Sequence, residues 1–101
     1  MPRKIAEYTL NVDQSSVVTI DMPEGAIPFA VETRVNQPVL FAMGDPEAKK
    51  TPRTFRLAEN NETILNHPST LKYVGTTFVD VSEGMGIGLP AVALHVFEVL
   101  P

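Results

Sequence analysis

The sequence predicts a single all-β domain over residues 1–101, built as an antiparallel β-sandwich or small barrel of about seven strands. A chain of 101 residues has the length of one ordinary domain. Nine prolines and six glycines divide it into short apolar segments, and few windows keep the three- and four-residue spacing of a helix. Within these segments apolar and polar residues alternate, which is typical of strands with one buried face.

The first two strands are expected at 5–12 and 17–22, separated by the polar segment 13–16. The alternation in the first places one set of side chains on the same face, namely Ala6, Tyr8, Leu10 and Val12. We expect these two strands to form a hairpin with each other. A tight turn is expected after them at Pro23-Glu24-Gly25.

The middle of the chain predicts a strand at 29–35, a second at 39–43 and an exposed loop at 45–52. The segment 39–43 is apolar at every position, which favours a central strand covered on both faces. The strand before it is expected to direct three apolar side chains inward, namely Phe29, Val31 and Val35.

A fifth strand is expected at 53–58, with Phe55 and Leu57 inward and Arg56 outward. Alternation disappears over 59–70, which predicts a long connection. We expect two apolar residues to fix this connection to the core, Ile64 and Leu65.

The last two strands are expected at 71–81 and 91–99, on either side of a glycine-rich loop at 82–90. Gly75 predicts a β-bulge in the first of them. The best core candidates of the second are Val92, Leu94 and Val96.

Composition argues against several classes of protein. The formal net charge is −4, with eight basic and twelve acidic residues, so we do not expect nucleic acid as a partner. Cysteine is absent, which excludes disulfides and thiolate chemistry within the chain. No apolar run has the length of a signal peptide core or a membrane helix, so we expect no contact with a membrane.

No set of residues predicts catalysis, a metal site or a cofactor. The two histidines are His67, in the polar connection, and His95, within the last strand, and both are interpreted as structural. The serines lie in turn segments and none has the context of a nucleophile elbow. We therefore expect a protein that is not an enzyme and holds no cofactor or metal.

Two groups of residues are candidates for partner binding. The loop 82–90 carries apolar residues that either fold onto the core or dock on another protein, namely Met85, Ile87 and Leu89. A basic cluster, either an ordinary solvated surface or a site for anions or acidic proteins, contains Lys49, Lys50, Arg53 and Arg56.

Several sequence blocks, taken in order, carry a resemblance to a known family. They are 4–10 (KIAEYTL), 20–26 (IDMPEGA), 37–42 (QPVLFA), 53–57 (RTFRL), 73–76 (YVGT) and 94–98 (LHVFE). The chain resembles a family of small uncharacterised proteins encoded largely by bacteriophages and prophages. That resemblance implies a setting in phage-infected bacteria and no assigned site residues. The loop 82–89 is longer than that family leads us to expect.

We therefore expect a non-enzymatic phage protein that binds and modulates a macromolecule in the host bacterial cytoplasm, such as a defence or host-takeover target. One alternative is a virion component, for instance a capsid decoration or cement protein, because such proteins need only a rigid β domain with adhesive edges. A third is a homo-oligomer that sequesters a small ligand such as a nucleotide at a subunit interface.

Overall fold

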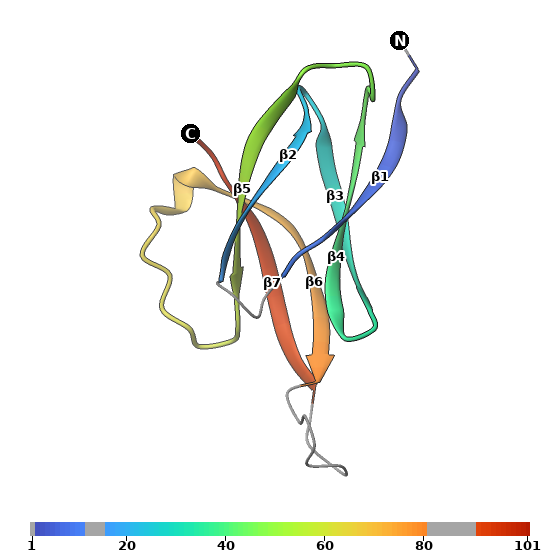
Figure 1. Cartoon of the computed structure of the whole chain (residues 1–101). Coiled ribbons are helices and arrows are strands. Elements are labelled where there is room, and N and C mark those ends of the chain that lie inside the picture. The colour runs from blue at the N-terminus through green and yellow to red at the C-terminus, as the bar shows by residue number, and fades with distance from the viewer. Residues whose placement is uncertain (1, 12–15, 81–90) are drawn as a thin grey trace.

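A computed structural model describes residues 2–11, 16–80 and 91–101, with residue 91 described for its backbone alone. These residues form seven strands and one short 3-10 helix (Figure 1). In chain order the elements are β1 (Lys4–Thr9), β2 (Val17–Pro23), β3 (Ile27–Arg34), β4 (Gln37–Gly44), β5 (Lys50–Ala58), η1 (Pro68–Thr70), β6 (Leu71–Asp80) and β7 (Ala91–Val99). The prediction of an all-β fold of about seven strands is confirmed.

The strands form two antiparallel sheets, one of three strands in the order β1-β4-β3 and one of four strands in the order β2-β5-β7-β6. The molecule is therefore a small sandwich. The expected hairpin between the first two strands is wrong, because β1 pairs with β4 while β2 pairs with β5 in the other sheet. Alternation along a strand indicates which face is buried, but it does not indicate which strand is the neighbour.

Side chains from both sheets fill the space between them. The largest fully buried apolar side chains are Leu10, Met22, Leu40, Phe55 and Val96. The inward faces expected for Phe55, Leu57, Leu94 and Val96 are confirmed, since all four belong to this core.

One side of the sandwich is closed by contacts between β3 and β6. The hydroxyl of Thr33 donates a hydrogen bond to the carbonyl of Phe78 over 2.6 Å. The side-chain amide of Asn36 donates to the carbonyl of Asp80 (2.9 Å) and accepts from its backbone N–H (2.7 Å). These bonds join the end of β6 to the end of β3 and the turn that follows it, while the edge strands β1 and β2 lie on the other side (Figure 1).

The bulge expected at Gly75 is confirmed, because the register of β6 against β7 shifts between Tyr73 and Gly75. The backbone of β3 approaches closely at this point. A Cβ atom added to Gly75 would lie 3.3 Å from the backbone nitrogen of Val31. A glycine here therefore allows the two sheets to meet at their shared side.

Three apolar residues expected to face the core are exposed instead. Val35 occupies the β3–β4 turn with φ 48° and is 98% exposed. Phe29 lies at a register shift between Pro28 and Ala30, which turns its side chain outward. Leu65 is almost fully exposed, so it does not fix the connection 59–67 to the core.

The loop expected at 45–52 is shorter than predicted, because β5 begins at Lys50 and pairs there with Pro23. Pro52, the last residue of the expected loop, lies within β5. Of the two strands beside β5, β7 pairs only from Thr54 onward. Pro52 therefore lies where β5 has one neighbouring strand, a position that tolerates a missing N–H.

Candidate functional site

The four basic residues of the predicted cluster do not form one patch. Arg53 and Arg56 are three positions apart on β5, so their side chains leave opposite faces of the sheet. Arg56 extends along the outer face, where it bonds Glu62 at 2.5 Å and the carbonyl of Leu57. Hydrogen bonds from Arg56 and from the backbone of Glu59 lower the pKa of the Glu62 carboxyl below its usual value.

The other two members of the cluster, adjacent in sequence, also differ in their surroundings. Lys49 lies 3.6 Å from the carboxylate of Glu24, with both side chains well exposed. Lys50 lines a cavity between the two sheets.

The apolar residues Met85, Ile87 and Leu89 lie outside the described residues, so their role in partner contact stays a prediction.

Arg53 points into the sandwich, where it forms a two-point ion pair with Glu98 of β7. The Arg53 Nη2 to Glu98 Oε1 distance is 2.9 Å, and the two side chains are 20% and 6% exposed. The hydrogen bond to Glu98 raises the pKa of Arg53, so the guanidinium stays charged. The sequence carried a signal for this pair, because Glu98 continues the inward alternation of Leu94 and Val96.

Both histidines take part in local hydrogen bonds. His95 joins two segments, with Nδ1 at 2.9 Å from the hydroxyl of Thr76 and Nε2 at 2.6 Å from the side-chain oxygen of Asn60. His67 accepts a hydrogen bond from the backbone of Ser69 and caps η1. No group of three or more metal-ligating side chains gathers within 2–11, 16–80 and 91–101.

The outer face of the three-stranded sheet carries a group of apolar side chains, four exposed and one half-buried, which we call the apolar face. Ile5, Met43 and Ile27 are paired neighbours across β1, β4 and β3. Ile5 is 62% and Phe29 is 46% exposed. The members of the apolar face are Ile5, Ile27, Phe29, Phe41 and Met43. The expectation that β4 is a central strand is confirmed, and Val39 on its outer face is buried, but the expected cover is missing at Met43.

A shallow hollow of about 380 Å³ lies in the apolar face. Arg34 lies at the border of the hollow. Its guanidinium forms an ion pair with Glu7 at 2.6 Å and lies 5.5 Å from the centre of the Phe41 ring. Glu32 also lines the hollow and has no ion pair with a described residue. The surface combines an apolar centre with one carboxylate free to meet a cation.

The outer face of the four-stranded sheet is different, because polar side chains bond across it. Tyr73 reaches the hydroxyl of Thr76 at 2.6 Å, and Thr76 in turn reaches His95. The connection 59–67 runs beside this sheet, away from the three-stranded sheet (Figure 1), and is held there by Asn60 and Glu62. Phe78 on this face is nevertheless 59% exposed, close to the value for Ile5 on the apolar face.

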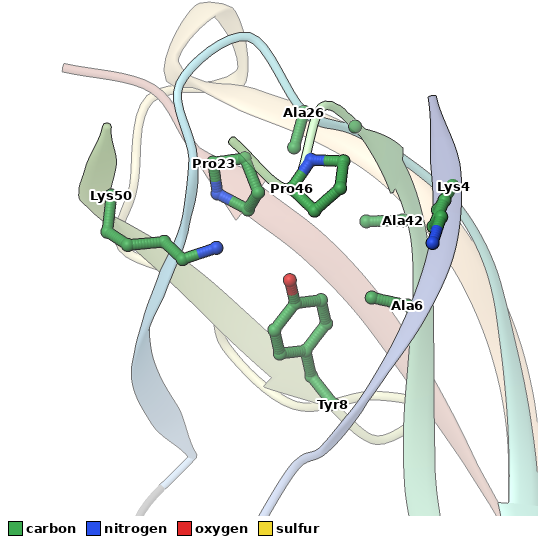
Figure 2. A pocket seen from close by; sticks show the side chains of 9 residues that line it. Lys4, Ala6, Tyr8, Pro23, Ala26, Ala42, Pro46 and Lys50 are labelled. Carbon is green, nitrogen blue, oxygen red and sulfur yellow. The ribbon is translucent and has the colours of Figure 1, made fainter. Parts of the chain in front are cut away.

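A small cavity of about 70 Å³ opens between the sheets on the side of β1 and β2. Figure 2 shows the hydroxyl of Tyr8 pointing into it, with the side chain of Lys50 extending toward that hydroxyl and Lys4 across from it. Pro23 and Pro46 form part of its wall. A wider hollow of about 610 Å³, lined by Lys72 and the Arg53–Glu98 pair among others, lies beside the C-terminal residues.

Within the part of the chain that the structure describes, no helix has the length and apolar character needed to cross a lipid bilayer. No curated protein and no solved structure matches this chain. One family model does match, and it extends from residue 1 to residue 101, the full sequence. The chain therefore belongs to the uncharacterised family described as Domain of unknown function (DUF7352).

Proposed function

We propose that this domain is a non-enzymatic binding protein of bacteriophage origin, which attaches to a host bacterial protein and modulates it. The proposed contact surface is the apolar face of the three-stranded sheet. The observation that supports it is the exposure of Ile5, Ile27, Phe29 and Met43 together on one sheet surface. Apolar side chains gathered on one exposed face are a recurring mark of surfaces that bind other proteins.

The chemistry of the apolar face also indicates the kind of partner. Its centre favours apolar side chains, and the hollow provides a place for one of them to insert. Glu32 at the border forms no ion pair with a described residue, and the neighbouring Arg34 is paired with Glu7. We therefore expect the partner to present an apolar patch with a lysine or arginine at its edge, since complementary charge fixes orientation and excludes other partners.

The test is capture from bacterial lysate by the immobilised full chain, with quantification of bound proteins by mass spectrometry and measurement of the affinity for any purified partner. In the test variant, Ile5→Ser and Phe29→Ser are combined. Both side chains would be buried in the complex with the partner, so their removal should weaken binding at least about tenfold. Both side chains are exposed in the free protein, so the melting temperature should change little.

Phe78→Ser is the matched control, because Phe78 is an exposed apolar residue on the outer face of the other sheet. It should bind the partner like the original chain. If Phe78→Ser loses the partner and the double variant keeps it, the apolar face is not the contact surface. Alanine replacements at Met85, Ile87 and Leu89 decide in the same assay whether that loop shares the contact.

The virion alternative is decided by mass spectrometry of purified phage particles. A host-directed protein should be absent from them or present only in traces. Recovery in fixed stoichiometry with a capsid protein, without capture of a host protein, would overturn the proposal in favour of a structural role.

A further inference from the structure

The cavity between the two sheets brings together side chains from parts of the chain that are distant in sequence. Lys4 and Tyr8 come from β1, and Lys50 from the first residue of β5. Lys4 and Tyr8 share one face of β1 because they are four positions apart in an extended strand. The pairing of β1 with β4 and of β2 with β5 then brings this face of β1 opposite Lys50.

The two lysines at this cavity have no ion-pair partner among the described residues. Four of the eight basic residues form ion pairs with described carboxylates, namely Arg34, Lys49, Arg53 and Arg56. Two of the other four, Lys4 and Lys50, both line this one cavity. Neither has a described carboxylate within ion-pair distance. Both lysines are exposed residues, so their ammonium groups are accessible to a ligand that enters from solvent.

The walls of the cavity strengthen any charge interaction inside it. Pro23, Ala26 and Ala42 are buried and present apolar surface. A wall of low polarity lowers the effective dielectric constant, so an anion is attracted more strongly here than on an open surface. The volume of about 70 Å³ is well below that of sites for drug-sized ligands, but it admits one small group.

We propose that this cavity binds a single oxyanion group, a carboxylate or a phosphate, which accepts hydrogen bonds from the ammonium groups of Lys4 and Lys50 and from the hydroxyl of Tyr8. Figure 2 shows these three side chains around the cavity. The three donors suit an anion because an ammonium group has no acceptor atom and the phenol can direct its O–H into the cavity. The inference uses different residues from the apolar face and does not depend on the proposed function.

The test is a titration of the ¹⁵N-labelled full chain with sodium phosphate, sodium acetate and sodium chloride at equal ionic strength, followed by two-dimensional NMR. Phosphate or acetate should give saturable shifts of the amide signals of residues that line the cavity, such as Ala6 and Ala42. Chloride should not. The oxyanion whose shifts saturate at the lower concentration is the preferred ligand, and a preference for either carboxylate or phosphate supports the proposal.

Variants test the assignment of the donors. Lys50→Met keeps most of the side-chain length and should lower the affinity about tenfold, because it removes a charged donor. Tyr8→Phe should lower it about fivefold by removing the hydroxyl alone. Lys49→Met, the adjacent lysine outside the cavity, should leave the affinity unchanged.

The spectra of the variants also show whether each variant is folded. The proposal is overturned if neither oxyanion gives saturable shifts beyond those of chloride. It is also overturned if folded Lys50→Met binds as well as the original chain, or if Lys49→Met weakens binding as much as Lys50→Met does.

Discussion

The Arg53–Glu98 pair shows that the role of a charged residue depends on the face of the strand from which its side chain extends. On the sequence Arg53 is one of several basic residues near Lys50, and a solvated side chain is the ordinary interpretation. In the fold it lies on the inner face of β5 and is held at two points by a carboxylate that is almost fully buried. Two-point pairing of this kind compensates part of the cost of removing both charges from water.

Breaking this pair from one side should destabilise the protein strongly. Arg53→Met leaves the Glu98 carboxylate buried without its partner, so we expect a loss of about 3 kcal/mol in the free energy of unfolding, measured in urea at pH 7. The double variant Arg53→Met with Glu98→Met should recover much of that loss. Arg34→Met removes the exposed pair with Glu7 and should cost about 1 kcal/mol or less. Equal losses for Arg53→Met and Arg34→Met would contradict the buried character of the first pair.

Glu62 provides a prediction on acid stability. Its pKa is lowered from the usual 4.5 in the folded protein, chiefly by the hydrogen bond from Arg56. A carboxyl with a lowered folded pKa contributes stability that is fully present above its unfolded pKa, and this contribution is lost as the pH falls through the folded pKa. Glu62→Gln should therefore be less stable than the original chain at pH 7, and the difference should shrink below about pH 4.5.

The measurement is urea unfolding of both proteins at a series of pH values, together with an NMR titration of the Glu62 carboxyl carbon. In Arg56→Met the midpoint of that titration should move up toward the usual value. A stability difference that stays constant from pH 7 to pH 3 would show that Glu62 does not act through its charge.

At the scale of elements, alternation predicted the strands well because it reports burial directly. Phe55, Leu57, Leu94 and Val96 followed the expected pattern, since a strand with one buried face must place every second side chain in the core, while Val92 at the start of β7 is only half-buried. The same alternation places Arg53 and Arg56 on opposite faces of β5. The sequence therefore already indicated that the basic cluster does not form one patch. Glu98 could also have been placed on the inner face by counting from Val96.

The bulge and the turn of β3 were harder to predict than the bulge at Gly75, because no glycine marks them and a single extra residue reverses which side chains of a strand face inward. The register shift beside Phe29 turns an expected core residue into a surface residue. Val35 fits the alternation of apolar residues along the strand, but β3 itself ends one residue earlier, at Arg34. The residues Val35 and Asn36 both have positive φ, which is the backbone of a two-residue hairpin turn that Asn and Gly favour.

Val35 leads to a prediction on the β3–β4 hairpin. A β-branched residue is strained at φ 48°, and its exposed side chain gains nothing from packing. Val35→Asn should raise the free energy of unfolding by about 1 kcal/mol, because asparagine tolerates this backbone conformation. Val35→Thr is the control, since threonine is polar but still β-branched and should bring no comparable gain. A gain of equal size in both variants would assign the effect to polarity instead of backbone strain.

At the scale of the molecule, the two sides of the sandwich are built differently. One side is closed by bonds between β3 and β6 and by the close approach at Gly75. The other is bordered by the edge strands β1 and β2, and the small cavity opens there. Strand order decides which edges meet, and a single sequence does not specify strand order, because many pairings satisfy the same alternation.

This explains how much of each candidate site the sequence could predict. The apolar face needs β1, β4 and β3 to be neighbours, whereas the sequence led us to expect β2 beside β1 and gave no indication of β4 there. The oxyanion cavity joins Lys50, an expected candidate, to Lys4 and Tyr8, which nothing in the sequence set apart. Tyr8 shares a face of its strand with the buried Leu10, and it packs against the core as a partly buried residue.

Strand β1 takes part in both proposed surfaces through the alternation of its side chains. Ile5 points to the apolar face, while Lys4 and Tyr8 point to the cavity on the reverse side. In its sheet this strand is bonded to a single neighbour, β4. A protein that displaces β1 from one side thus alters the geometry offered to an anion on the other. Linkage makes any such influence reciprocal: whatever factor one bound molecule applies to the affinity of the second, the second applies to the first.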